Sequence, residues 1–537
     1  MFISQPLSRL FAVAVVTLIS VNGFAAATPW GAIVTGDQSE AERLATVDLQ
    51  RYLAQVTGKM PRVMTAAEWA RRPVPAVVTG TPGNNALLEG LPFDWSQAGT
   101  QGYVLSGFTL HGVRVAIAAA NTSEGAVNGQ YGLLRRLGYG FYLGDESAPA
   151  ALPEQFDDTP QCHRPSRDIR GVLPWYNFFN SPTAWDPIDH RAFVDQLLRM
   201  GANFVGFHTY DSEPFAAYAG PDGAMKMGEP LVNTATPTWG SKAVSSRDFA
   251  FGTDLFYGAD YFGAESTLTG ATRDESIRAQ QAILRDALDY ARRRGLHTCI
   301  GFEFSGDPFD AATRDVFTER LACLLDTYPA VEYVWIWQPE MVGAFGHWNG
   351  SKTMDAYALG RSDAFSRIIH AQAGDPAFFD KTAAGAQSRA REGARFEQFA
   401  QLAYRVLAHR TPQPRLVLSG WGGDDRLLSA EYYEGLDKLL PKDVVFASLD
   451  FINPKPRVDR IYHDLPPDRE RWPIPWLEWD GDQWHAQPYV HTYELLVRDV
   501  EQSGSQGLLG IHWRTRDIAE NLAFLVDSAW QRGLTAD

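Results

Sequence analysis

The chain has 537 residues, of which 45% are hydrophobic and 21% charged, an ordinary globular mixture whose length favours two domains over one. A formal net charge of −16 argues against a nucleic-acid or anionic-membrane partner, because such partners demand a basic face. The three cysteines, Cys162, Cys299 and Cys323, are spaced neither like a disulfide framework nor like a zinc site. No metal or other cofactor is predicted.

Residues 1–27 have the layout of a secretory signal peptide. Arg9 precedes the apolar run Leu10–Val21, and a stretch of small residues ends at Ala27. An uncleaved membrane anchor is the alternative, but a run of about a dozen residues is short for the roughly 20 that span a bilayer. We therefore expect an exported protein, periplasmic or extracellular, with no membrane span after signal removal.

Residues 28–150 form a predicted small α/β domain. Ser39 is placed to cap a helix that runs to about Gln55 and that Gly58 ends, and a second helix is expected over Thr122–Leu137. Short apolar runs predict strands at Ala32–Gly36, Pro75–Gly80, Gly102–Ser106 and Gly112–Ala118. The proline-rich residues 151–166 are expected to be a linker.

From residue 167 to 537, short apolar runs alternate with segments of helical period. The predicted strands are Ile169–Trp175, Asn203–His208, His297–Phe304, Val331–Gln338, Arg415–Trp421, Val444–Phe451, Ile474–Asp480 and Gly507–Arg514. The predicted helices are Asp189–Met200, Asp274–Arg294, Ala312–Tyr328, a region within Asp355–His409, Ala430–Leu439, Arg457–His463, Thr492–Gln502 and Asp517–Arg532. Eight β-then-α cycles predict a (β/α)8 TIM barrel.

Two long insertions, at residues 212–270 and 341–391, follow the second and fourth predicted strands. The first is rich in aromatic residues, which argues against disorder. Loops that follow barrel strands gather on the face where active sites are built, so both insertions are expected there.

Carboxylates stand at the C-terminal ends of several predicted strands, the position from which a barrel assembles its active site. Glu303 ends the third strand and Glu340 follows the fourth. In the seventh, alternation places Trp476, Glu478 and Asp480 on one face and Leu477 and Trp479 on the other, so that an acid points into the barrel mouth.

Aromatic and hydrogen-bonding residues accompany these acids. Indole rings can stack on sugar rings, although some of the tryptophans will instead be barrel core. Two arginines near the last strand could clamp a uronic-acid carboxylate, or one of them could hold Glu478 or Asp480 ionised. The candidate substrate-binding residues are Trp175, Asn177, His208, Tyr210, Trp337, Trp421, Asp450, Asn453, Trp476, His512, Arg514 and Arg516.

The sequence lacks the motifs of several other common classes of enzyme. It has no His/Cys cluster of the zinc type, no glycine-rich phosphate cradle after a strand, and no G-x-S-x-G nucleophile elbow. Two carboxyl groups in a tryptophan-lined mouth are the equipment of a glycosidase: one protonates the leaving oxygen and the other attacks the anomeric carbon or activates water.

An α/β domain followed by a (β/α)8 barrel resembles the glycoside hydrolases of the α-glucuronidase and β-hexosaminidase type. The segments Gly80-Thr-Pro and Ala119–Gly138 are similar to the N-terminal domain of those enzymes. The Asp-Glu pair that hexosaminidases carry after strand four is absent, because Pro339 precedes Glu340. The resemblance implies hydrolysis of glycosidic bonds in a poly- or oligosaccharide.

A second resemblance is positional. Retaining glycosidases of the large barrel clan place the acid/base after strand four and the nucleophile after strand seven, which implies these roles for Glu340 and Glu478. An inverting enzyme would use Glu303 or Glu340 as the acid and Asp480 as the base. A glycan-binding protein without catalysis, or a polysaccharide lyase that uses Tyr, His and Arg residues, are the alternatives from other classes.

Overall fold

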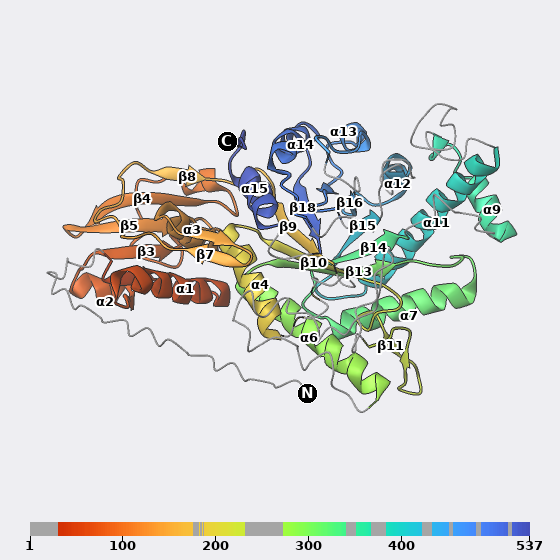
Figure 1. Ribbon diagram of the computed structural model, residues 1–537, viewed down its shortest axis with the longest axis horizontal. Helices are drawn as coiled ribbons and strands as arrows, with labels where there is room; N and C mark the ends of the chain where they lie inside the picture. The colour runs from red at the N-terminus through yellow and green to blue at the C-terminus, as the bar shows by residue number, and fades with distance from the viewer. Residues whose placement is uncertain are drawn as a thin grey trace, which may run out of the picture.

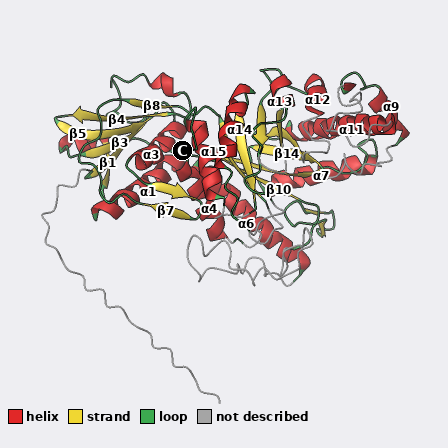
Figure 2. Ribbon diagram, turned by 45° about the horizontal axis from the view of Figure 1, so that its top comes forward, coloured by secondary structure: helices red, strands yellow, loops and turns green. Residues whose placement is uncertain are grey.

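The computed structural model describes residues 30–175, 182, 185, 187–230, 272–339, 351–366, 383–420, 432–449, 455–479, 485–513 and 518–536. An N-terminal α/β unit lies beside a β/α barrel, with helices of the barrel between the two sheets (Figure 1). The C-terminal end of the chain lies near the last helix, on the side of the barrel that faces the N-terminal unit (Figure 2). The predicted fold class is confirmed.

The N-terminal unit is built on a six-stranded sheet with the order β2-β1-β3-β5-β4-β8. The strands are β1 (Ala32–Thr35), β2 (Arg62–Thr65), β3 (Ala76–Gly80), β4 (Tyr103–Leu110), β5 (Val113–Ala119) and β8 (Gln161–His163). The pairs among β2, β1, β3 and β5 are parallel, whereas β4 pairs antiparallel with both of its neighbours. A small hairpin, β6 (Gly140–Tyr142) and β7 (Asp145–Ser147), follows the main sheet in sequence.

Helices cover both faces of this sheet. Helices α1 (Glu40–Thr57) and α3 (Ser123–Arg136) pack in one apolar cluster with strand residues such as Ile33 and Val77. The opposite face, with Val34 and Val78, buries Trp69 of the short helix α2 (Ala66–Arg71); a 3-10 turn, η1 (Trp95–Ala98), also lies in this unit. A parallel strand with a helix on each side carries apolar residues on both faces, which is why these strands read as continuous apolar runs.

The ends of α1 follow the sequence signals. Ser39 and Glu42 form a reciprocal capping box, and Gly58 takes the left-handed conformation (φ 69°) that ends the helix. Strand β8 lies within residues 151–166, the segment expected to be a linker, and pairs with β4 as an edge strand of the N-terminal sheet. The strand β2 and the helix α2 were not predicted; three of the four residues of β2 are exposed, so it lacks the apolar pattern.

The barrel is a sheet of eight parallel strands with the order β17-β16-β15-β14-β13-β10-β9-β18. Its strands are β9 (Ile169–Pro174), β10 (Phe204–Thr209), β13 (His297–Glu303), β14 (Tyr333–Gln338), β15 (Arg415–Gly420), β16 (Val445–Leu449), β17 (Arg471–Ile474) and β18 (Gly507–His512). β18 pairs with β9, and a bridge between Trp476 and Ile511 joins β17 to β18. The number and order of the predicted barrel strands are confirmed, but the seventh strand lies earlier than predicted: β17 ends at Ile474, where the predicted strand began, and Trp476 adds only an isolated bridge.

The outer helices follow in the predicted order. They are α4 (Pro187–Met200), α6 (Arg273–Arg294), α7 (Ala311–Thr327), α9 (Lys352–Leu359), α11 (Ala383–Leu407), α12 (Tyr433–Leu439), α13 (Ile461–Asp464), α14 (Val490–Gln502) and α15 (Ala519–Trp530). The first insertion contains a two-stranded hairpin, β11 (Tyr218–Ala219) and β12 (Met225–Lys226), beside α7. Residues 231–271 and 340–350 lie outside the described part of the chain.

A buried charge cluster joins the two units. Asp48 of α1 accepts hydrogen bonds from Tyr131 of α3 (2.8 Å) and from Arg294 of α6 (2.6 Å), and Arg199 of α4 lies 3.4 Å away. Burial raises the pKa of Asp48, but Arg199 and Arg294 outweigh burial, so the pKa of this carboxyl falls below its usual value. The N-terminal unit is therefore docked on α4 and α6 by buried charges.

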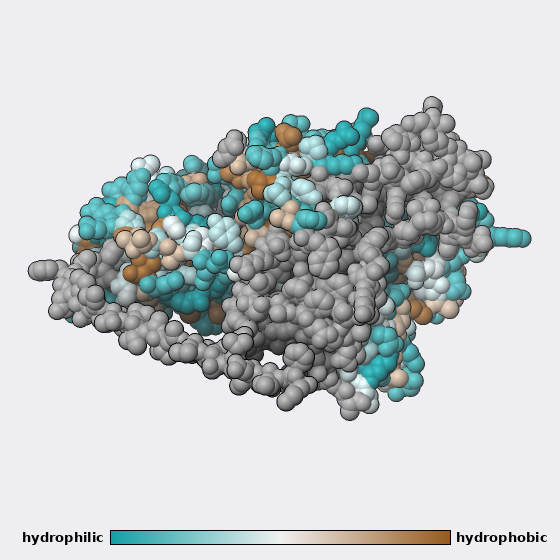
Figure 3. Space-filling model, viewed as in Figure 1, coloured by the Kyte–Doolittle hydropathy of each residue, from teal (hydrophilic) through white to brown (hydrophobic). Residues whose placement is uncertain are grey.

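Hydrophobic side chains on the described surface are scattered among hydrophilic ones on the face shown in Figure 3. Within the described residues, no helix is both long enough and apolar enough to cross a membrane. The three cysteines are free thiols, with Cys299 buried in β13.

Candidate active site

The barrel interior is filled by aromatic side chains, which reach the C-terminal ends of the strands. The residues of this inner cluster alternate along each strand, as in Tyr333, Trp335 and Trp337 of β14. In the register, Glu303 of β13 stands opposite Trp337, so the carboxylate belongs to the inward-facing series at the barrel mouth. The exposed fraction of the Glu303 side chain is 19%.

Four aromatic rings form a connected group beneath this mouth. His208 stacks on Trp175 (ring centroids 4.7 Å apart, planes 14° apart) and contacts Trp337 (4.4 Å). Tyr210 meets both His208 and Trp175 edge-on, at 5.2 and 5.6 Å. Trp175, Trp337 and His208 are buried and Tyr210 is half-buried, so the two indoles form a floor, and Tyr210 and Glu303 are the partly accessible groups.

His208 and Glu303 are neighbours across β10 and β13. The Nε2 atom of His208 lies 3.7 Å from a carboxylate oxygen of Glu303, a contact longer than a hydrogen bond. Burial lowers the pKa of His208, and Glu303 only partly offsets this effect. The imidazole is therefore neutral near pH 7, when one ring nitrogen can donate a hydrogen bond and the other can accept one.

A second carboxyl group near this site belongs to Glu213, which is buried next to Tyr210 and close to Glu303. Its Oε2 accepts a hydrogen bond from the backbone N–H of Tyr210 (3.0 Å), and its own N–H donates to the Tyr210 carbonyl (3.0 Å). Burial raises the pKa of Glu213 to about 8, and the nearby Glu303 contributes to this rise. Sequence reasoning missed Glu213, because a glutamate in a polar loop gives no sign that the fold buries it.

Glu478 lies on the side of the barrel opposite Glu303, where the segment after β17 meets β18. Its Oε1 accepts the backbone N–H of Trp513 (2.8 Å), and the residue is fully buried. Trp476 belongs to the inner cluster and Leu477 to the outer one, as alternation predicts for these two residues. The Trp476 ring packs against Trp513, with centroids 4.8 Å apart.

His512 does not face the mouth. Leu509, Ile511 and Trp513 are the inward residues of this segment, so His512 is on the helix side, where its ring lies 5.6 Å from that of Phe193 in α4. Its expected contact with substrate is therefore not supported by its position.

Eight of the predicted site residues lie outside the described part of the chain: Glu340, Asp480, Asn177, Trp421, Asp450, Asn453, Arg514 and Arg516. Of the predicted residues that are described, Trp175, His208, Tyr210, Glu303 and Trp337 are brought together. Glu478 and Trp476 lie across the barrel from β13, just after strand β17. Among the described residues, no group of three or more His, Cys, Asp or Glu side chains is arranged to hold a metal ion.

No protein-family model and no curated protein matches the sequence. Solved structures of similar fold include a GH138 enzyme targeting pectin rhamnogalacturonan II (11% identity, TM-score 0.50), the GH115 4-O-methyl-α-glucuronidase BtGH115A, with specificity for decorated arabinogalactans (14%, 0.50), and CpGH84B (11%, 0.52). The matches cover 93%, 94% and 94% of this chain. The chain spans 50% and 56% of the first two proteins and 68% of the third, and the likeness is one of fold.

Proposed function

We propose that the protein is an exported glycoside hydrolase that cleaves a poly- or oligosaccharide at the barrel mouth. The observation that carries this proposal is Glu303, on the inward series of the rim beside buried indole rings, with a second carboxylate, Glu478, buried at the rim on the side of the barrel opposite β13. Solved proteins of similar fold are glycoside hydrolases, which supports the same class of reaction. Carbohydrate is the substrate class that such a floor and such acids suit.

In this proposal Glu478 is the nucleophile and Glu340 is the acid/base of a retaining reaction. The acid protonates the glycosidic oxygen while Glu478 attacks the anomeric carbon, and water then releases the glycosyl-enzyme with the acid acting as a base. Glu303 is the alternative acid, because it is partly accessible and has a neutral imidazole beside it. With Asp480 as a base, the same mouth would invert the configuration instead.

The uronic-acid preference is part of the proposal and rests on Arg514 and Arg516 as a guanidinium clamp for a carboxylate. One structure of similar fold is a 4-O-methyl-α-glucuronidase, which supports including uronic-acid-containing glycans in a screen. The signal-like residues 1–27 support export.

One observation favours a second candidate, a glycan-binding protein without catalysis. Glu478 is fully buried and satisfies a backbone N–H, which is also what a purely structural carboxylate does. In that case substituting the rim acids would alter binding but no turnover would exist.

The deciding experiment is hydrolysis of a glycan panel, followed by proton NMR of the anomeric products. Wild-type protein is compared with Glu303→Gln, Glu340→Gln and Glu478→Gln. Loss of a catalytic carboxyl should lower kcat by about 10²–10⁴-fold, and retained anomeric configuration supports Glu478 as the nucleophile. Inversion supports Asp480 as the base, and wild-type rates in all three variants would rule out the proposed chemistry.

A further inference from the structure

A pocket of about 290 Å³ opens on the outer shoulder of the barrel, directly beside Glu303. It lies between the end of β13, the first turns of α7 and the loop that follows β12. The residues that determine its character are Met227, Glu303, Ser305, Thr313, Val316 and Arg320. Its volume is close to the lower end of the range of small-molecule sites, about 300–1,000 Å³.

The lining combines apolar walls with a few polar groups. Phe302 and Phe317 are buried beneath the pocket, and Val316 is 42% exposed at its edge. Ser305 and Thr313 contribute hydroxyl groups, and Glu303 contributes a carboxylate. A sugar ring has the matching combination of an apolar face and a hydroxyl rim.

Arg320 is the cationic residue among those that line the pocket. Its side chain is 4% exposed, it forms an ion pair with Asp211, and its guanidinium lies 4.0 Å from the centre of the Phe302 ring. Its Nη2 atom has no hydrogen-bond partner among the described residues. A buried donor of this kind calls for an acceptor, and because Arg320 lines the pocket, a small shift of its side chain would let a ligand oxygen or a water molecule supply one.

The charge balance selects the kind of sugar. Asp211 already neutralises Arg320, while Glu303 and the helix-capping Asp310 add two carboxylates to the lining. The pocket therefore has no surplus positive charge for the carboxylate of a uronic acid, whereas hydroxyl groups can both donate to Glu303 and accept from Arg320.

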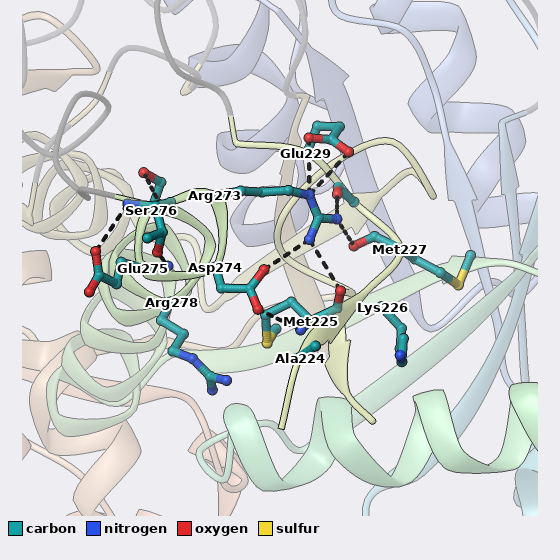
Figure 4. A network of polar contacts seen from close by, with 12 residues as sticks. Ala224, Met225, Lys226, Met227, Glu229, Arg273, Asp274, Glu275, Ser276 and Arg278 are labelled. Carbon is teal, nitrogen blue, oxygen red and sulfur yellow. Dashed lines mark hydrogen bonds and ion pairs between the residues drawn. The ribbon is translucent and has the colours of Figure 1, made fainter. Parts of the chain in front are cut away.

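Met227 forms the wall opposite α7, and its backbone is held in an unusual conformation. Its φ of 58° lies in the left-handed region that side-chain-bearing residues rarely adopt. Arg273 donates hydrogen bonds to the carbonyls of Met225 (3.1 Å), Met227 (3.1 Å) and Gly228, and it pairs with Glu229 (Figure 4). In Figure 4 the Met227 side chain extends away from this guanidinium, so the clamp fixes the backbone while the thioether remains free to line the pocket.

We propose that this shoulder pocket is a binding subsite for one neutral sugar ring of the glycan whose neighbouring residue occupies the barrel mouth. The inference rests on the proposed function for the identity of the glycan, since Glu303 borders both the mouth and the pocket. It adds to that function a second recognition point outside the barrel and a preference for an uncharged sugar there.

The test fills the pocket without touching the rim acids. Val316→Trp places an indole in the pocket from an exposed helix position, and Asp315→Trp places the same group on the neighbouring exposed position of α7, which does not line the pocket. Thermal unfolding of both variants checks that the fold is kept. Binding is measured by saturation-transfer NMR with neutral gluco-, xylo-, manno- and galacto-oligosaccharides and with galacturonic-acid oligosaccharides, and KM is measured for every substrate that is cleaved.

The expected result is an increase of about tenfold in Kd or KM for neutral oligosaccharides in Val316→Trp, with wild-type values in Asp315→Trp and for the shortest substrates. Equal affinities in wild type and Val316→Trp would overturn the subsite, while continued hydrolysis would leave the proposed function standing. Loss of binding in Val316→Trp without hydrolysis by the wild type would support the subsite and reject the proposed function. Weakened binding of galacturonic-acid oligosaccharides alone, or no binding of any probe by the wild type, would overturn the neutral subsite.

Discussion

The imidazole of His208 lies almost parallel to the indole of Trp175, with the ring centroids 4.7 Å apart. The stack joins the ends of the neighbouring strands β9 and β10, and it holds the ring so that Nε2 is 3.7 Å from Glu303. An imidazole beside a candidate acid is thus held in place by packing, and burial keeps this imidazole neutral.

His208→Phe should make the fold less sensitive to acid. Because burial lowers the pKa of His208 below its usual 6.5, the unfolded chain takes up a proton as pH falls through about 6.5, and this part of the stability is lost as pH falls further. The variant retains an aromatic ring but cannot protonate. Its Tm relative to wild type should therefore rise between pH 7.5 and pH 5 in differential scanning calorimetry. His491→Phe, at an exposed position of α14, serves as the control, and a pH-independent difference for His208→Phe would contradict the assignment.

Glu213→Gln should change stability in the opposite pH direction. The folded pKa of about 8 lies above the ordinary 4.5, so the stabilising proton is fully held below pH 4.5 and its contribution is lost as pH rises toward 8. The amide oxygen of Gln can still accept the Tyr210 N–H, so the variant keeps this hydrogen bond but has no carboxyl to ionise. The Tm of the variant relative to wild type should rise between pH 5 and pH 8. The exposed Glu319→Gln provides the matched control, and parallel Tm curves would refute the prediction.

Two substitutions at Glu478 separate its structural role from its proposed chemical one. Gln can accept the Trp513 N–H, so Glu478→Gln should unfold near the wild-type temperature while losing turnover. Glu478→Ala leaves that buried N–H unpaired and should cost a further 1–3 kcal/mol or so. Urea unfolding of both variants measures the difference. Equal stabilities of the two variants would show that the hydrogen bond contributes nothing.

Asp48→Asn should weaken the attachment of the N-terminal unit to the barrel. It removes a carboxylate that Arg199 and Arg294 share in a buried setting, and breaking a buried ion pair typically costs about 3–5 kcal/mol. Asp286→Asn breaks the partly exposed pair with Arg191 and should cost less than about 1 kcal/mol. Calorimetry distinguishes one transition from two. A loss for Asp48→Asn no larger than that of the control would contradict a docking role.

The barrel could be predicted from the sequence because its strands are short apolar runs buried on both faces, and most of them are separated from the next by a helical pattern of a dozen or more residues. Burial on both faces also makes it harder to predict which side chains point into the barrel. Where both faces of a strand are apolar, the alternation of side chains does not show which face is the inner one. The sequence therefore does not show that His512 lies on the helix side of β18, near Phe193, whereas alternation predicts the facing of Trp476 and Leu477.

The site was less predictable than the fold. Glu303 could be found from its place at a strand end, but Glu213 could not, because its burial depends on the hairpin loop folding back so that Gly228 hydrogen-bonds to Asp211. The predicted linker likewise contained a strand that only its pairing with β4 reveals. The burial of Glu213 and the formation of β8 both depend on contacts between segments distant in the sequence, and local composition does not predict such contacts.

The pairing of β18 with β9 has a consequence for how the chain is synthesised and folded. Gly507 of β18 pairs with Ile169 of β9, so the two strands that meet here come from opposite ends of the barrel sequence. The first barrel strand therefore leaves the ribosome long before its partner exists, and it has an unpaired edge until then. The ring can close only after β18 has been made, closing so long a loop makes folding slow, and until then the open edge of β9 is vulnerable to edge-to-edge aggregation.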